Sequence, residues 1–504
     1  MGEPADGVGG DGGAEARRSR VTAAVRPAWM GREISIIWWA RVAMSASRAL
    51  AGVITPLYLA AIGFDALRLG VLMVAVAATS AVLSAVIGLA SDRLGRKPFL
   101  ILLPLASALA GVAFAFSSSV GILFVAAAIG SFGRGAGAGA GAVGPYQPAE
   151  SALVTDLASP TTRSRAFGRL AFGSSLGALA GGLLATLAGG GHPLARAALA
   201  TYRPAFLATA ALSLVAGLVA LAIREPRRPP ARTGAPRRPR LPHRSFPLLW
   251  RLWVTNSFNG LAVGMFGPFV TYWFYLRYGA SAAEIGVLYA VINAATLVST
   301  LSAAGLAERF GLVRTVVAVR TAQALLLVPM VLAPSFLLAG GLYLVRMVVQ
   351  RIGLPLRQSY VLAMADPDER ASVTALSNLP SQLAMAGSPV AAGYLFDEVS
   401  LSLPFEIASL LQLANTVTFW WFFRHAAPDE EREGRRGTGS AARAPAWARA
   451  RAAAEPDGPG VVRPVASAPR PTGASTDIVG VRMAAGVPGA PAPQSPGAPR
   501  AARP

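Results

Sequence analysis

The chain has 504 residues, of which 53% are hydrophobic and 14% are charged, with a formal net charge of +21 at pH 7. Soluble domains carry about a quarter charged residues, so the composition predicts an integral membrane protein. The arginines lie in the tails and between apolar runs rather than among aromatic residues, which argues against nucleic acid as a partner. The absence of cysteine excludes disulfides and thiolate metal sites.

The first 30 residues are rich in glycine and polar side chains. Their arginines, Arg17, Arg18 and Arg20, could belong to a twin-arginine export signal. However, the first apolar run continues into a long membrane pattern without a small-residue cleavage site. We therefore interpret residues 1–30 as a disordered cytoplasmic tail before a retained helix.

Apolar runs of the length that a spanning helix needs, about 20 residues, recur along the chain. We count twelve, at approximately 34–62, 68–90, 98–117, 120–144, 166–188, 202–223, 249–275, 283–306, 315–333, 336–356, 376–396 and 402–424. The sequence therefore predicts an all-α integral membrane fold with twelve transmembrane helices.

The loops divide these helices six and six. Residues 224–247 are rich in proline and arginine and read as a cytoplasmic linker between two bundles, 31–223 and 248–425. Residues 426–504 consist mainly of Ala, Pro, Gly and Arg and are expected to be a disordered tail. The excess of arginine in alternate loops predicts a multi-pass protein of the cell membrane with both termini in the cytoplasm.

The two halves resemble each other in sequence. GFDALRLGVL at 63–72 matches GASAAEIGVL at 279–288, and at the same offset DRLG at 92–95 matches ERFG at 308–311. Such a repeat indicates a duplicated six-helix unit. Parallel repeats of this kind place a substrate site near the membrane midplane, between the halves.

The loop between the second and third runs carries an unusual charge cluster, GLASDRLGRKPFL at 88–100. A glycine at 95 permits a tight turn, and Gly88 permits close approach of a neighbouring helix. The charged residues of this loop are Asp92, Arg93, Arg96 and Lys97. On this reading alone, the cluster could also be a simple positive topology anchor.

The twelve runs, the linker, the repeat and this loop together resemble the major facilitator superfamily of secondary transporters over roughly residues 31–425. The family's signature is matched in full by Gly88, Asp92, Arg93, Gly95, Arg96 and Lys97. The resemblance implies two six-helix bundles and a latch that holds the halves together. In such a latch Asp92 would face the start of helix 11, and Arg96 would pair with Glu150 or Asp156 of helix 4.

Two further patterns resemble efflux members of that family in part. Helix 4 contains Arg134 followed by small residues, without the usual glutamine. Helix 5 reads GSSLGALAGG, with the glycines Gly173, Gly177, Gly181 and Gly182 but without the usual proline. Tight helix packing explains the glycines equally well. We expect efflux rather than uptake.

Charged residues inside spanning helices usually face a cavity or a partner. Arg48, Arg134 and Arg346 lie at mid-depth and are predicted to line a substrate cavity, whereas Arg41 is expected to extend toward the interface. Intramembrane amides are further candidates, namely Asn256, Asn259 and Asn293, although such amides more often bond a neighbouring helix.

Acidic residues are scarce within the runs. Only Glu150 and Glu406 lie near the helices in positions where a coupling proton could bind, since arginine does not titrate. The excess of arginine over acid at depth favours an anionic substrate.

These features predict a transporter of a small organic molecule, anionic or similar to a drug or sugar, working in the lipid bilayer. We expect a monomer with the proton as a candidate coupling ion and without a cofactor or metal. An enzyme is disfavoured because no nucleophile, metal cluster or phosphate-binding loop is visible. A non-transporting sensor or scaffold on a transporter fold is the alternative.

Overall fold

The computed structural model describes residues 30–132, 145–159, 162–189, 195–225, 244–299, 312–364, 369, 373 and 376–424, all within the compact unit Met1–Gly437. Across these residues the chain is helical and has no strand, which confirms the all-α prediction. Arg134, most of the linker, residues 1–29 of the predicted N-terminal tail and the predicted C-terminal tail lie outside the described residues.

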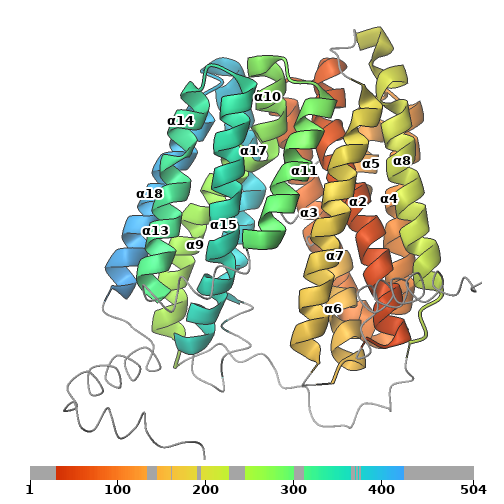
Figure 1. The fold of residues 1–504 in the computed structure, drawn as a ribbon, viewed down its shortest axis with the longest axis horizontal. Helices are drawn as coiled ribbons and strands as arrows, with labels where there is room; N and C mark the ends of the chain where they lie inside the picture. The colour runs from red at the N-terminus through yellow and green to blue at the C-terminus, as the bar shows by residue number, and fades with distance from the viewer. Residues whose placement is uncertain are drawn as a thin grey trace, which may run out of the picture. The chain divides into compact units, whose positions relative to one another are not determined.

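Each of the six predicted runs of the N-terminal half contains helix (Figure 1). Helix 1 is α2 (Arg32–Ala61), helix 2 is α3 (Ala66–Leu94) and helix 3 is α4 (Lys97–Phe116). Helix 4 comprises α5 (Val120–Gly130) and α6 (Tyr146–Leu157), helix 5 is α7 (Arg163–Leu184) with η2 (Ala185–Ala188), and helix 6 is α8 (Ala195–Leu221).

The C-terminal half repeats this order. Helix 7 comprises α9 (Phe246–Phe266), η3 (Gly267–Phe269) and α10 (Val270–Tyr278), and helix 8 is α11 (Ala282–Ser299). Helix 9 comprises α13 (Leu312–Leu325) and α14 (Leu327–Leu332), followed by α15 (Phe336–Met364), α17 (Leu379–Glu398) and α18 (Leu403–Phe423) as helices 10 to 12. Proline at 268 coincides with the change to 3-10 geometry in helix 7, because it cannot donate the helical hydrogen bond.

Seven helical stretches in the described part of the chain are long and apolar enough to cross a membrane. Many of their side chains point outward although they are apolar, such as Leu109 at 71% exposure and Leu337 at 84%. Soluble proteins rarely expose an apolar surface of this extent to water. It is the surface that lipid chains solvate.

We call the end of the bundle where α8 ends and α9 begins the linker end, and the opposite end, where α2 ends and α3 begins, the far end. A single hydrophobic core at the far end contains residues of both halves, for example Tyr58 and Phe114 together with Phe269 and Tyr343. At the linker end two other cores are found, one formed by N-terminal residues and one by C-terminal residues. Among the described residues, the halves are therefore joined at the far end.

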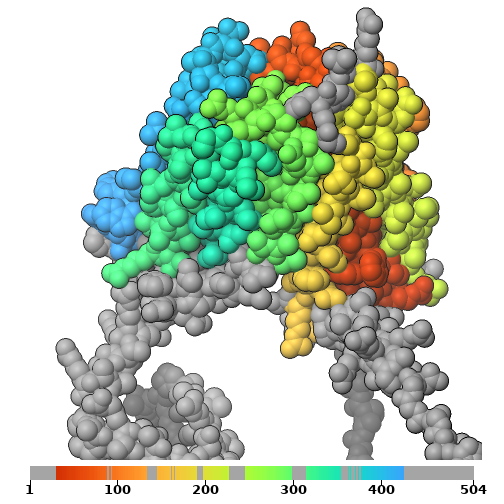
Figure 2. Space-filling model, turned by 45° about the horizontal axis from the view of Figure 1, so that its top comes forward, coloured from red at the N-terminus to blue at the C-terminus, as the bar shows by residue number. Residues whose placement is uncertain are grey.

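The most extensive contacts across this junction are those of α3 with α17 and of α7 with α11. In the space-filling view of Figure 2 the green α11 region lies directly against the yellow α7 region. The backbones approach closely: a β-carbon at Gly70 of α3 would lie 2.4 Å from the Pro389 carbonyl oxygen of α17. Small residues permit such contact between helices in a membrane.

The glycine-rich face of α7 packs mainly against α2. A β-carbon at Gly177 would lie 2.2 Å from the carbonyl oxygen of Val42, and one at Gly181 would lie 2.2 Å from that of Ala46. The side chains that these glycines lack would therefore collide with the α2 backbone. Packing alone accounts for this part of the helix 5 pattern, without reference to the direction of transport.

Replacement of Gly177 by alanine should therefore destabilise the protein. Overpacking of this kind costs about 1–3 kcal/mol, which would lower the midpoint of thermal unfolding of the purified protein. The matched control is Gly168→Ala on the same helix, where no atom of the described residues lies within 4 Å of the added carbon and alanine should be neutral or stabilise the helix. Equal effects at both positions would contradict the packing account.

Candidate functional site

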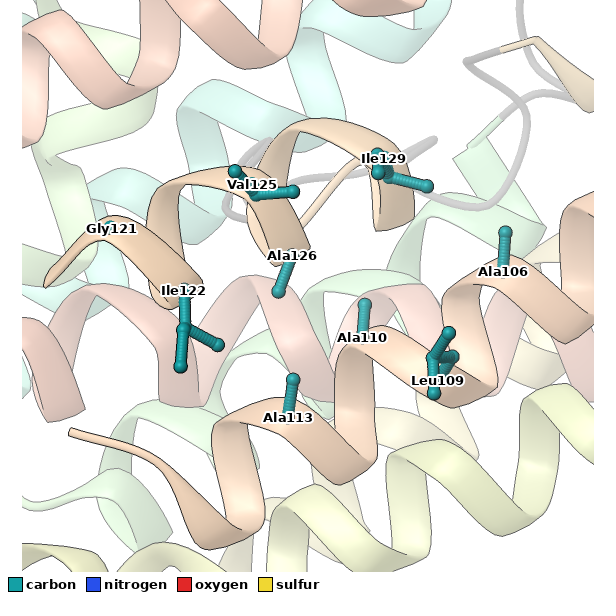
Figure 3. A pocket seen from close by; sticks show the side chains of 9 residues that line it. All are labelled: Ala106, Leu109, Ala110, Ala113, Gly121, Ile122, Val125, Ala126 and Ile129. Atoms are coloured by element: carbon teal, nitrogen blue, oxygen red, sulfur yellow. The ribbon is translucent and has the colours of Figure 1, made fainter. Parts of the chain in front are cut away.

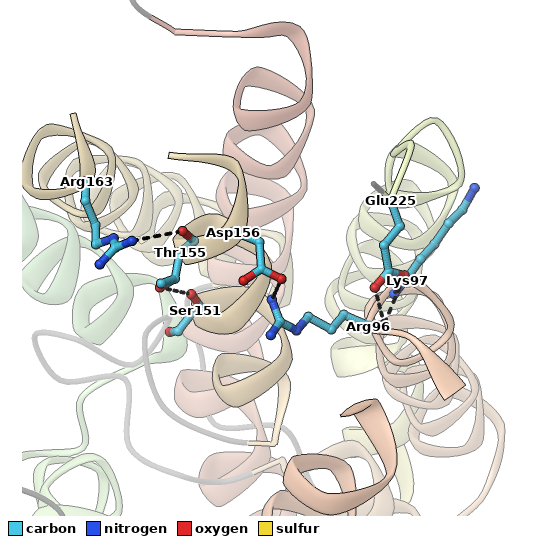
Figure 4. A network of polar contacts seen from close by, with 7 residues as sticks. All are labelled: Arg96, Lys97, Ser151, Thr155, Asp156, Arg163 and Glu225. Atoms are coloured by element: carbon cyan, nitrogen blue, oxygen red, sulfur yellow. Dashed lines mark hydrogen bonds and ion pairs between the residues drawn. The ribbon is translucent and has the colours of Figure 1, made fainter. Parts of the chain in front are cut away.

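The turn between helices 2 and 3 has the geometry that its sequence predicts. Gly95 has a φ of +84°, and a β-carbon there would lie 2.9 Å from a Glu225 carboxylate oxygen. The Glu225 carboxylate accepts hydrogen bonds of 2.9–3.0 Å from the backbone amides of Arg96 and Lys97 (Figure 4). A carboxylate is favourable there because it meets the unpaired amides and the positive dipole end of α4.

The side chain of Arg96 lies on the other side of this turn. It is buried and forms an ion pair with Asp156 of α6 (Figure 4). Asp156 is one of the two acids that the sequence offered as its partner. In this network the turn, the end of helix 4 and the start of the linker are tied together within the N-terminal half.

Three signature residues occupy the last turns of α3, namely Gly88, Asp92 and Arg93. Their side chains lie outside the described part of the structure. A contact between Asp92 and the start of helix 11 therefore stays a prediction.

Glu150, the other acid proposed for Arg96, has a different neighbour. It is completely buried and forms a 2.9 Å ion pair with Arg41 of helix 1. Arg41 itself is only 7% exposed, whereas the sequence suggested that it would extend toward the interface. The reason is that α6 packs against α2, so a carboxylate is available to Arg41 inside the protein.

Two more polar residues complete this group. Arg48, two turns further along α2, is half-buried and interacts electrostatically with the Glu150 carboxylate. Tyr146 of α6 is buried, and its hydroxyl group has no hydrogen-bond partner in the described part of the chain. We call Arg41, Arg48, Tyr146 and Glu150 the helix 1–4 charge cluster.

The C-terminal half contains a second buried charge at Arg346 of α15. Its side chain is completely buried, and its guanidinium group lies 4.1 Å from the ring centroid of Phe266 on α9. Its Nη1 donates to the sulfur of Met347 at 3.9 Å, while Nε and Nη2 have no acceptor among the residues that the structure describes. The predicted cavity residues Arg48 and Arg346 thus lie in different halves.

The predicted amides are mainly engaged in contacts within the protein. Asn256 donates a 2.6 Å bond to the Ser377 carbonyl, and Asn293 donates a 2.8 Å bond to the Tyr289 carbonyl within its own helix. Asn259 is half-buried. The bonds of Asn256 and Asn293 are those expected of amides that stabilise helices.

An apolar pocket of about 350 Å³ lies between α4 and α5 (Figure 3). Its lining consists of Ala106, Leu109, Ala110, Ala113, Gly121, Ile122, Val125, Ala126 and Ile129. Several of these side chains are exposed on the apolar surface of the bundle. This pocket lacks the polar groups that would orient a charged or hydrogen-bonding substrate.

A contact that sequence reasoning missed joins the halves at the far end. Asp397, near the end of helix 11, accepts hydrogen bonds from the backbone amides of Ala66 at 3.1 Å and Leu67 at 2.7 Å. These amides form the N-terminus of helix 2, where a carboxylate is favourable. The available signal was an acid in the last turn of a helix, which by itself does not reveal the helix it faces.

Substitution of Asp397 by asparagine should weaken the junction at the far end. The loss of a charge at a helix N-terminus costs about 1 kcal/mol, enough to shift the balance of conformations roughly fivefold. Because the chain has no cysteine, spin labels can be placed at Leu187 and Val399, which are exposed at the far end of the two halves. The variant should show a larger population of long distances between them.

The control for that measurement is Asp65→Asn. Asp65 caps its own helix through the Arg68 amide at 2.7 Å and does not bridge the halves through this bond. An unchanged distance distribution in Asp397→Asn, or equal shifts in the two variants, would contradict a junction held by Asp397.

Comparison with solved structures identifies several transporters with the same fold. A bacterial homologue of the human lysosomal transporter Spinster, inward-facing and unoccupied, has a TM-score of 0.57 at 16% identity, covering 79% of this chain and 96% of that one. The nucleoside transporter NupG has a TM-score of 0.60 at 13% identity, covering 78% and 100%. A D-xylose-proton symporter has a TM-score of 0.59 at 14% identity, covering 77% and 97%.

The sequence itself matches the Major Facilitator Superfamily at residues 37–257 and 252–456. A comparison with curated proteins finds no match. The family match covers both halves, and the helical order, the signature turn and the likeness to solved transporters agree with it. The chain belongs to the Major Facilitator Superfamily.

Proposed function

We propose that this protein is a proton-coupled secondary transporter that exports a small organic molecule across the cell membrane by alternating access. The buried ion pair between Arg41 and Glu150 carries the proposal. The arrangement of the hydrophobic cores supports alternating access, because the halves share one core at the far end and have separate cores at the linker end.

The ion pair supports proton coupling because only one of its partners can change charge. Arginine stays protonated, whereas a carboxylate can bind a proton and become neutral. Ionised Glu150 holds Arg41 and so ties α6 to α2. A proton on Glu150 removes this attraction and leaves a buried guanidinium without its counter-ion, so the packing of helix 1 against helix 4 responds to protonation.

The other acid that the sequence offered, Glu406, is less suitable for this role. It lies in the first turn of α18 at the far end and is exposed. A group at the surface gains or loses a proton without affecting the helices of the opposite half. Glu150, by contrast, is completely buried and paired with Arg41 between α6 and α2.

Two contacts at opposite ends of the α3–α17 pair would let the protein alternate between its two conformations. Asp397 of α17 holds the N-terminus of α3 at the far end. We propose that Asp92 at the end of α3 holds the start of α17 in the other conformation. The export direction rests on the Arg134 pattern of helix 4, which lies outside the described residues.

A pH jump applied to proteoliposomes on a solid-supported membrane tests the proton site without knowledge of the substrate. The wild-type protein should displace charge when the pH changes, and Glu150→Gln should abolish the signal because glutamine cannot bind the proton. Glu406→Gln should keep it. A signal of wild-type size in Glu150→Gln would refute the assignment.

Loss of Glu150 alone could unfold the protein, since breaking a buried pair costs about 3–5 kcal/mol. The double variant Arg41→Gln and Glu150→Gln removes both charges and avoids an unpaired arginine. It should fold and also lack the signal. Persistence of charge displacement in the folded double variant would equally exclude the pair as the proton site.

A further inference from the structure

Arg346 lies at the depth where a substrate site is expected. It is ten residues from the start of α15 at Phe336, which corresponds to about 15 Å along the helix axis at 1.5 Å per residue. The hydrocarbon core of a membrane is about 30 Å thick. The guanidinium group therefore lies near the midplane, where a charge is least tolerated.

The unused donors of Arg346 form one edge of its planar group. Within the described part of the chain, Nε and Nη2 have no acceptor, and the hydrogen bond of Nη1 goes to the Met347 sulfur. The N–H groups of Nε and Nη2 point the same way, and together they form the fork that a carboxylate fits with two parallel hydrogen bonds. Among the described residues, none of the ion pairs involves Arg346.

The surroundings of this fork are aromatic. Phe266 covers one face of the guanidinium group at 4.1 Å. Tyr343 lies one turn before Arg346 on α15, and its ring centroid is 6.1 Å from that of Tyr289, which shares a 3.2 Å hydrogen bond with Thr271. A ligand at the fork would therefore meet ring faces and hydroxyl groups.

We propose that Arg346 binds the carboxylate of a small monocarboxylic acid with an apolar or aromatic body, through Nε and Nη2. This inference rests on the proposed function and names its substrate class. The single charge of a carboxylate balances the single charge of Arg346. A phosphate monoester carries close to two negative charges at neutral pH, more than this one guanidinium group balances.

Binding at this site would favour the conformation that buries Arg346. Phe266 and Met347 belong to the hydrophobic core that both halves share at the far end, which also includes Tyr58 of helix 1. Separation of the halves at the far end would admit water to the guanidinium group, whereas closure without a ligand leaves it desolvated and unbalanced. A carboxylate supplies the missing charge in the closed state, and such differential affinity is what a ligand needs to shift a conformational equilibrium.

Thermal unfolding of the purified full chain in nanodiscs tests this site with simple probes. Benzoate should raise the unfolding midpoint, and the neutral isostere benzamide should not. Phenylphosphonate should raise it less than benzoate. Equal effects of benzoate and benzamide would overturn the proposal, and a stronger effect of phenylphosphonate would overturn the assignment to carboxylates.

Arg346→Met separates a binding role from a structural one. Removal of an unbalanced buried charge should raise the midpoint without ligand and abolish the response to benzoate. Arg346→Lys keeps the charge but loses the fork, and should weaken the apparent affinity for benzoate at least tenfold. If Arg346→Met unfolds earlier than wild type, the arginine is structural. If the variant still responds to benzoate, benzoate does not bind at Arg346. Either result would overturn the proposal.

The matched control is Arg320→Lys. Arg320 is also a buried arginine of the C-terminal half over a phenylalanine ring, but its Nη1 donates to Asn415. This variant should keep the benzoate response, and its loss there would contradict a site at Arg346. Charge displacement after a pH jump is read independently, so a failed benzoate test with an intact proton signal refutes the carboxylate site and leaves the transport proposal standing.

Discussion

A charge inside a membrane must be balanced or excluded, and this constraint organises the polar part of the protein. The bilayer offers neither water nor counter-ions, so each buried charge needs a partner from the chain or from a ligand. Within the helices Arg41 has Glu150 and Arg320 has the amide oxygen of Asn415, and in the turn before helix 3 the buried Arg96 has Asp156. Arg346 has an aromatic ring and a weak sulfur acceptor, and thus differs from the other three.

The same electrostatic contact recurs at helix ends, where it sets the connections between segments. Glu225 meets the first amides of helix 3, Asp397 those of helix 2, and Glu369 accepts from the amides of Arg244 and Ser245 just before helix 7. Because a helix N-terminus is always positive, a carboxylate can release one such end and bind it again without a specific side-chain partner. This makes the contact suitable for a junction that opens and closes.

Much of the fold was predictable from the sequence because its signals are local. Apolar runs of spanning length predicted the twelve helices, and a glycine among charged residues predicted the turn at Gly95. Interruptions were less predictable. Helix 7 changes to 3-10 geometry near Gly267, and helix 9 is divided at Leu326, while its apolar pattern continues through the break.

The candidate site was less predictable because it depends on which helices are neighbours. Arg41 was expected near the interface, since a single helix does not reveal that Glu150 lies opposite it. Asp397 was not singled out for the same reason. Arg346 was predicted from its depth alone, but its unoccupied donor edge can be recognised only in three dimensions. Its role, like those of the other predicted cavity and latch residues, stays a prediction.

We propose that a proton site in one half is coupled to a carboxylate site in the other. Uptake of radiolabelled benzoate into proteoliposomes under an imposed pH gradient tests this connection most directly. We expect flux that follows the gradient in the wild-type protein and is lost in both Glu150→Gln and Arg346→Met. Benzoate flux that is indifferent to the gradient, or that survives both substitutions, would contradict it.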